Sequence, residues 1–153
     1  MNFHQDCELC RGDGGDVLYR EADLRVVLIA EADYPGFVRV IWNSHLAEMS
    51  DLAPAQRARV MAVVNAVELA QREVLAPAKI NLAAFGNMVP HLHWHVIPRF
   101  ADDAHFPQPV WGARQRDSDP ARLAARSERL PALRAAIVRR LAELSVLTEA
   151  AGV

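Results

Sequence analysis

The stretch that decides the fold is Pro90–Arg99, with the sequence PHLHWHVIPR. Within it, His91, His93 and His95 alternate with apolar residues. Alternate side chains of a β-strand lie on one face, so this pattern predicts a strand with three imidazoles on the same face, about 7 Å apart between neighbours. A strand face made of three histidines gives up apolar burial and needs polar partners, which favours a functional site over a core position.

Hydrophobic patterns before and after this strand predict an α+β fold. The expected strands are 17–20, 24–29, 38–42, 79–85 and 92–97. A long helix is expected to begin near Pro54, where proline suits a first turn, and to end near Pro77. Its expected buried stripe consists of Val60, Val63, Val64 and Val67. The order of strands, helix, strands and a last helix indicates a mostly antiparallel sheet.

The C-terminal third of the chain reads as a loop followed by a helix. Residues 101–120 contain three prolines and are expected to form the loop. Apolar residues then recur at helical spacing and form one stripe, which has to pack against something. These residues are Leu130, Leu133, Ile137, Leu141 and Leu144.

Composition and charge limit the classes of protein to consider. The chain has 153 residues, of which 52% are hydrophobic and 24% charged, as in a soluble domain with its own core. The formal net charge is -2, so no surface for duplex nucleic acid is expected, although one local pocket can still bind phosphate. The first residues lack a signal-peptide pattern and no apolar run is long enough to span a membrane, so we expect a cytoplasmic protein without a membrane partner.

Cys7 and Cys10 are the two cysteines of the chain, and their C-x-x-C spacing indicates metal binding or redox chemistry. A redox pair usually follows a strand and begins a helix, and no strand is expected before Cys7. The three alternating histidines are an alternative set of metal ligands. On one straight strand, however, they spread over about 13 Å, so all three cannot converge on a single ion.

The alternating motif resembles the signature of the histidine-triad (HIT) superfamily, His-φ-His-φ-His-φ-φ. The similarity extends to the C-x-x-C, to Ile41–His45 at the end of the third strand, and to Gly86–Asn87, where the family usually has Gly-Gln. The resemblance implies a HIT-like fold with a five-stranded, mostly antiparallel sheet, a long central helix and a C-terminal helix. We expect a single HIT domain over residues 1–153, with its core at about 7–100 and its C-terminal loop and helix at about 101–153.

The resemblance also implies an activity. Family members place the α-phosphate of a nucleotide beside the middle histidine, here His93, which forms a covalent nucleotidyl-histidine. His95 would then stabilise charge on phosphate oxygens or the leaving group. By the same resemblance, Asn81 and Asn87 orient phosphate oxygens and Asp33 holds the ribose hydroxyls. Each of these three could equally be a residue of a turn or a strand end.

The substrates implied by the resemblance are dinucleoside polyphosphates, such as diadenosine tetraphosphate, or nucleoside phosphoramidates. The protein would hydrolyse them or transfer their nucleotidyl group. Many family members carry a serine directly after Gly-Gln, where this chain has Met88. A homodimer is also implied, because family members usually continue the sheet across two subunits, and the apolar C-terminal stripe favours the same association.

A structural zinc ion is the implied cofactor. Cys7, Cys10, His45 and His91 stand where zinc-binding family members have ligands, and they form a set of the Cys2His2 type. Free thiols or a redox pair are the alternatives for the cysteines. Two alternatives remain for the function: a metallohydrolase that uses the triad as ligands, and a zinc-stabilised nucleotide-binding or interaction module with little turnover.

Three further features have weaker interpretations. Arg99 is either a phosphate contact or, as we expect, an ordinary surface charge. The aromatic and proline-rich stretch Phe106–Trp111 either covers a purine pocket or packs across a dimer interface. No functional role is expected for His4 or His105, because each stands apart from the other histidines.

Overall fold

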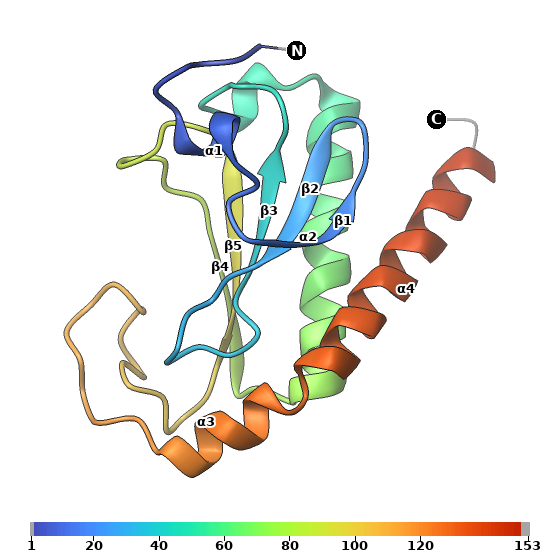
Figure 1. The fold of residues 1–153 in the computed structure, drawn as a ribbon. Coiled ribbons are helices and arrows are strands. Elements are labelled where there is room, and N and C mark those ends of the chain that lie inside the picture. The colour runs from blue at the N-terminus through green and yellow to red at the C-terminus, as the bar shows by residue number, and fades with distance from the viewer. Residues whose placement is uncertain (1, 151–153) are drawn as a thin grey trace.

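A five-stranded antiparallel sheet forms the centre of the computed structural model, which describes residues 2–150, the side chains of 147–150 excepted (Figure 1). The strand order is β1-β2-β3-β5-β4, and every neighbouring pair is antiparallel. The strands are β1 (Asp16–Arg20), β2 (Leu24–Leu28), β3 (Val38–Trp42), β4 (Lys79–Ala83) and β5 (His93–Arg99). β5, which carries two of the three histidines, therefore lies between β3 and β4.

Two long helices cover one face of this sheet. Figure 1 shows α2 and α4 side by side on that face, with α1 on the opposite side. The helical elements are α1 (Glu8–Arg11), η1 (Met49–Asp51), α2 (Pro54–Leu75), α3 (Pro120–Ser127) and α4 (Leu130–Ala150). None of the helices within residues 2–150 has the length and apolar character needed to span a bilayer.

The alternation of side chains along the strands separates the core from the site. Val26, Val40 and Val96 point to the helices and are fully or almost fully buried in the main core. The neighbouring residues of β5, His93 and His95, therefore point to the opposite face, where α1 lies. β5 thus supplies core residues on the face covered by α2 and two imidazoles on the opposite face of the sheet.

The predicted α+β HIT-like architecture is confirmed, with small differences at the ends of elements. The predicted strand 79–85 ends at Ala83, where its pairing with β5 also ends. The chain then turns at Gly86, whose φ of 79° lies in the left-handed region that favours glycine. The C-terminal helix is preceded by a second one, α3, because Asp119 caps its first turn and Pro120 suits its first position.

The C-terminal stripe packs within the chain. Leu133, Ile137 and Leu141 are buried in the same core as α2, and Leu130 and Leu144 pack against it. The stripe is therefore covered without a second subunit. Our expectation that this stripe favours a dimer is wrong, and the homodimer itself stays a prediction.

A buried arginine ties the N-terminal segment to the sheet. Arg25 of β2 is 3% exposed. Its guanidinium donates hydrogen bonds to the backbone oxygens of Leu9, Gly12 and Asp13 and to Oδ1 of Asn43. Because α1 and the Gly-rich turn after it have few apolar side chains of their own, these four bonds hold the segment with Cys7 and Cys10 in place.

Candidate active site and metal centre

The triad strand is held on both edges, which fixes the positions of its side chains. In the sheet, His93 pairs with Ile41 of β3, and His95 pairs with Arg39 of β3 and Ala83 of β4. The side chains of His93 and His95 are 8% and 5% exposed, and their ring centroids lie 4.8 Å apart. Two adjacent, almost buried imidazoles thus share one wall of the site.

The tautomer of His93 follows from its hydrogen bond. Its Nδ1 atom lies 2.6 Å from the backbone carbonyl oxygen of His91. A carbonyl can only accept, so Nδ1 carries the hydrogen and Nε2 of the neutral ring keeps its lone pair. Burial also lowers the pKa of His93, which favours this neutral form. His93 therefore presents a nucleophilic nitrogen.

His95 has the opposite arrangement. The Nε atom of Arg39 donates to its Nδ1 atom, at 3.4 Å. Because a guanidinium cannot accept, Nδ1 is the acceptor and the hydrogen of the neutral ring lies on Nε2. Burial, together with the nearby His93 and Arg39, lowers the pKa of His95 to about 3. At neutral pH, His95 is thus an uncharged hydrogen-bond donor beside His93.

Both histidines line a pocket of about 430 Å³. Its walls include Glu8 and Leu9 of α1, Arg39 of β3, and the turn of residues 85–89. Phe85 and Trp111 form an aromatic side, with ring centroids 4.9 Å apart, and Trp111 also lies 5.0 Å from the ring of His95. A planar, partly apolar ligand suits such a pocket.

A second cluster of side chains lies at the start of the same strand. Ligand atoms of Cys7, Cys10, His45 and His91 all lie within 4.8 Å of one another. Sγ of Cys7 lies 3.4 Å from Nδ1 of His91, and Sγ of Cys10 lies 3.4 Å from Nδ1 of His45. The structure thus brings together the four predicted ligands, and this cluster could bind a metal ion.

Three sulfur–nitrogen distances in this cluster match tetrahedral coordination of a metal ion. Sulfur and nitrogen ligands at the usual zinc distances would lie about 3.3–3.8 Å from one another, and three sulfur–nitrogen contacts of 3.4, 3.4 and 3.5 Å are present. Nε2 of His91 donates to the carbonyl oxygen of Trp42, at 2.6 Å, so its Nδ1 atom is free to act as a ligand. Of the triad, only His91 joins a cluster of metal-ligand type among the described residues.

Sequence and structure comparisons agree on the family. The sequence model of the HIT domain matches residues 13–102. The chain belongs to the HIT domain family. A histidine triad protein of known structure from Bradyrhizobium japonicum is 28% identical, with a TM-score of 0.68 over 92% of this chain and 98% of that one. Another, from Marinobacter aquaeolei VT8, is 26% identical, with a TM-score of 0.70 over 94% and 99% of the two chains.

Two further relatives carry names that mention a substrate or a metal. An AP-4-A phosphorylase of Mycobacterium tuberculosis is 29% identical over 86 residues, which cover 52% of this chain and 44% of the relative. The chain thus matches less than half of the length of that curated protein. A Zn-bound histidine triad family protein from Mycobacterium smegmatis is 24% identical, with a TM-score of 0.58 over 88% and 94% of the two chains, a likeness that shows the fold.

Within this HIT domain, the three predicted substrate-binding residues lie in different places. Asn87 is exposed and lines the pocket with His93 and His95. Asn81 lies on β4 outside the pocket lining, and its Oδ1 atom accepts from Arg99. Asp33 also lies outside it and accepts from Arg114 at 2.7 Å and from Ser118. These hydrogen bonds lower the pKa of Asp33.

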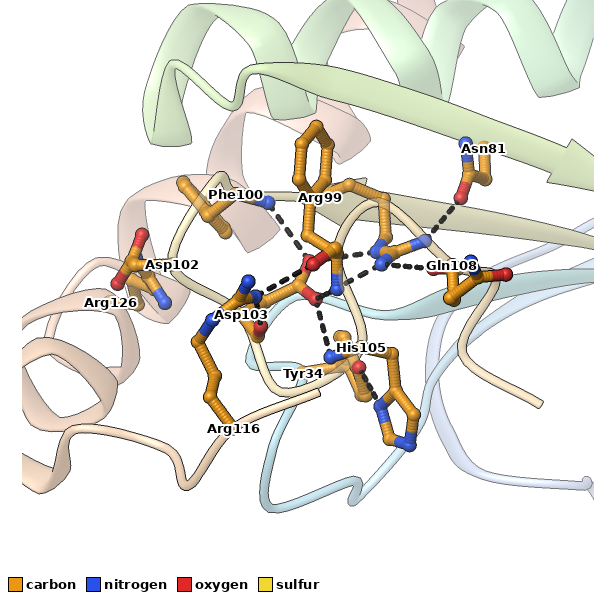
Figure 2. Close-up of polar contacts among 11 residues, drawn as sticks. Tyr34, Asn81, Arg99, Phe100, Asp102, Asp103, His105, Gln108, Arg116 and Arg126 are labelled. Carbon is orange, nitrogen blue, oxygen red and sulfur yellow. Dashed lines mark hydrogen bonds and ion pairs between the residues drawn. The ribbon is translucent and has the colours of Figure 1, made fainter. Parts of the chain in front are cut away.

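Arg99 corrects our expectation of a surface charge. It is 2% exposed and forms an ion pair with Asp103, with Nε 2.7 Å from Oδ2 (Figure 2). Its other nitrogens donate to Asn81 Oδ1 and to the carbonyl oxygen of Gln108. Asp103 in turn accepts from backbone N–H groups, those of Phe100, His105 and Phe106. The sequence signal for this pair is its i, i+4 spacing, which alone does not reveal burial.

This ion pair shapes the HIT domain's pocket from a distance. It anchors both ends of residues 103–108, the segment that leads to Trp111 (Figure 2). His105 adds a hydrogen bond to the hydroxyl of Tyr34, so it has a structural partner. Trp111 lines the pocket. Of the two interpretations of the Phe106–Trp111 stretch, this position agrees with the one in which the stretch covers a pocket.

Proposed function

We propose that this HIT domain is a nucleotide hydrolase or transferase that acts at an α-phosphate through a covalent nucleotidyl-His93. The observation that carries the proposal is the hydrogen bond between Nδ1 of His93 and the carbonyl oxygen of His91. It leaves the Nε2 lone pair of a neutral imidazole at the wall of the pocket. The likeness to an AP-4-A phosphorylase supports a dinucleoside polyphosphate or another nucleotide as the substrate.

The chemistry would proceed in two displacements. Nε2 of His93 attacks the α-phosphorus, a P–N bond forms, and the bond from phosphorus to the leaving group breaks with its electron pair on the leaving oxygen or nitrogen. In the second step, water or another acceptor attacks the same phosphorus and releases its proton to solvent, and the electron pair of the P–N bond returns to Nε2. Each step has a lower barrier than a single direct displacement.

His95 would stabilise the charge that develops in both steps. Its Nε2–H group can donate a hydrogen bond to a phosphate oxygen or to the leaving oxygen. A neutral imidazole of this tautomer donates a hydrogen bond but does not readily give up its proton. A leaving group that departs as a stable anion, as a polyphosphate does, therefore suits the site. Asn87, at the mouth of the pocket, is proposed to orient phosphate oxygens.

The cluster of Cys7, Cys10, His45 and His91 is proposed to hold a structural zinc ion, as its sulfur and nitrogen atoms and their spacing favour. Bound there, zinc would supply a cross-link between the N-terminal segment and the start of β5. Zinc bound to the side chain of His91 would also help to fix the backbone of that residue, whose carbonyl oxygen sets the tautomer of His93.

Several parts of the proposal rest on the family resemblance. These are a single HIT domain over residues 1–153, a homodimer and the contacts of Asn81 and Asp33 with substrate. A cytoplasmic location is also proposed, and it rests on the sequence pattern and not on that resemblance. The side-chain oxygens of Asn81 and Asp33 already accept hydrogen bonds from arginines. A substrate contact would therefore have to share or replace those bonds.

A substrate panel tests the function. Wild type, His93→Ala, His95→Ala and the control His105→Ala would be assayed for release of mononucleotide from diadenosine tetraphosphate and from a nucleoside phosphoramidate. We expect His93→Ala to lose turnover by many orders of magnitude and His95→Ala to lose about 100- to 1000-fold. His105 lies outside the pocket, so its variant should stay active. No mononucleotide release by excess wild-type protein would leave a binding module as the function.

A further inference from the structure

Arg39 is the cation of the pocket. It lies on β3, among otherwise apolar strand residues, and pairs directly with His95 of β5. Of the residues that line the pocket, Arg39 alone is a lysine or arginine. Because a guanidinium is always charged, Arg39 supplies a permanent positive charge at the pocket wall.

The guanidinium of Arg39 is half-buried and lies over the ring of Phe37, 5.9 Å from its centroid. It makes no ion pair with any carboxylate whose side chain the structure describes, and Glu8 influences it from across the same pocket without pairing. Its Nε atom donates to His95, while its terminal nitrogens have no hydrogen-bond partner among residues 2–146. A partly desolvated cation is costly unless an anion compensates it, and an arginine stays charged even when burial lowers its pKa.

Arg25 and Arg99 are buried arginines with a structural role, and their hydrogen bonds can be compared with those of Arg39. Arg25 uses its guanidinium on three backbone oxygens and on Asn43. Arg99 is paired with Asp103 and also holds Asn81. Each of them uses four of its five N–H donors on oxygen atoms of the protein. Arg39 differs because its terminal donors remain available at the pocket wall.

We propose that Arg39 binds phosphate oxygens of the ligand and is the residue that selects a phosphorylated nucleoside. This proposal rests on the proposed function of the same pocket and deepens it. A guanidinium presents parallel N–H donors that match two phosphate oxygens. Its contact with His95 places those donors beside the group that would stabilise the phosphate during reaction. A polyphosphate, with charge beyond the α-phosphate, would gain most from this cation.

Binding of adenosine 5′-monophosphate and of adenosine, measured by calorimetry, separates this role from a structural one. The proteins are the full-length wild type, Arg39→Met, Arg39→Lys and Arg57→Met. Arg57 is a matched control because it is also half-buried and lacks an ion pair among the described side chains, but it lies on α2, away from the pocket. A charge-assisted hydrogen bond to phosphate corresponds to about a 10- to 100-fold change in Kd.

We expect Arg39→Met to weaken binding of the monophosphate by about that factor and to leave adenosine binding unchanged. Arg39→Lys should recover part of the loss, and Arg57→Met should bind both ligands like wild type. Equal losses for adenosine and the monophosphate, or no loss, would overturn the role of Arg39 while the proposed function stands. If wild type bound neither ligand, the proposed function would fail, and this proposal with it.

Discussion

His93 donates its Nδ1 hydrogen to the backbone carbonyl oxygen of His91, at 2.6 Å. The side chain of His91 belongs to the Cys2His2 cluster, while its backbone sets the tautomer of the neighbouring histidine. His91 thus connects the Cys2His2 cluster with His93, which lies two positions further along the chain at the start of β5. The predictions below test the parts of this arrangement separately.

The Cys2His2 cluster is expected to carry about one zinc ion per chain in the purified protein, as measured by elemental analysis. Cys7→Ser and Cys10→Ser should lower both the metal content and the free energy of unfolding, since metal binding is coupled to folding. The control is Ala58→Ser, at an exposed position of α2. Metal-free protein as stable and active as the metal-loaded form would contradict the structural role.

The ion pair between Arg99 and Asp103 is expected to be essential for stability. Asp103→Asn leaves a buried arginine without its counterion and should cost about 3–5 kcal/mol in the free energy of unfolding, measured by denaturant titration. Asp117→Asn is the control, because that carboxylate is fully exposed. A cost for Asp103→Asn within about 0.5 kcal/mol of the control would be incompatible with the network.

The same carboxylate predicts a pH dependence. Burial by itself would raise the pKa of Asp103, but the hydrogen bonds from Arg99 and from three backbone N–H groups lower it below its usual range. Stability from an ionised carboxylate of lowered pKa is fully present above the ordinary carboxyl pKa and is lost as pH falls through the lowered value. The destabilisation of Asp103→Asn relative to wild type should therefore shrink in acid.

His95 should make the fold sensitive to milder acid. Its pKa is about 3 in the folded protein and about 6.5 in an unfolded chain. Between these values the unfolded chain binds a proton that the folded one excludes, so the free energy of unfolding decreases as pH falls, by up to about 1.4 kcal/mol per pH unit. His95→Asn should flatten this slope between pH 6.5 and pH 4. Parallel curves for the two proteins would show that His95 is not buried neutral.

Sequence patterns could predict the sheet because their signals are local. The four-residue cluster followed from the family resemblance instead, because Cys7 and His91 are 84 positions apart in the sequence. The strand at 38–42 matches β3 residue for residue, and the alternation around His93 gave the correct face. The Arg99–Asp103 network could not be predicted, because the burial of an arginine depends on residues such as Gln108 and Asn81 that only the fold brings together.

The position of Arg39 in the pocket could not be predicted for a related reason. The sequence does contain a signal for Arg39, because it is the one charged residue in the run Val38–Trp42. In the sheet, it pairs with His95. A charged residue inside an apolar strand usually marks a solvent-facing side. Here that side is the pocket, and the difference appears only once the sheet and α1 are in place.

The outer edge of β4 is where we expect a homodimer to form. β4 has β5 as its one neighbour in the sheet, and Leu82 and Phe85 beside this edge are 40% and 62% exposed. Leu82→Glu should shift the molar mass toward the monomer in light scattering at micromolar concentration, because a charge would be buried at the interface. Met61→Glu, at an exposed position of α2, should not change the molar mass. A monomeric wild type would rule out this association.

The central claim is that His93 becomes covalently nucleotidylated during turnover, and one trapping experiment tests it most directly. Protein mixed with diadenosine tetraphosphate is quenched at neutral or alkaline pH, because the phosphorus–nitrogen bond is labile in acid, and its intact mass is measured. We predict an added mass of one adenylyl group on wild type, mapped by peptide analysis to His93 and absent from His93→Ala. An adduct on His91 or His95, or full activity of His93→Ala, would contradict the account.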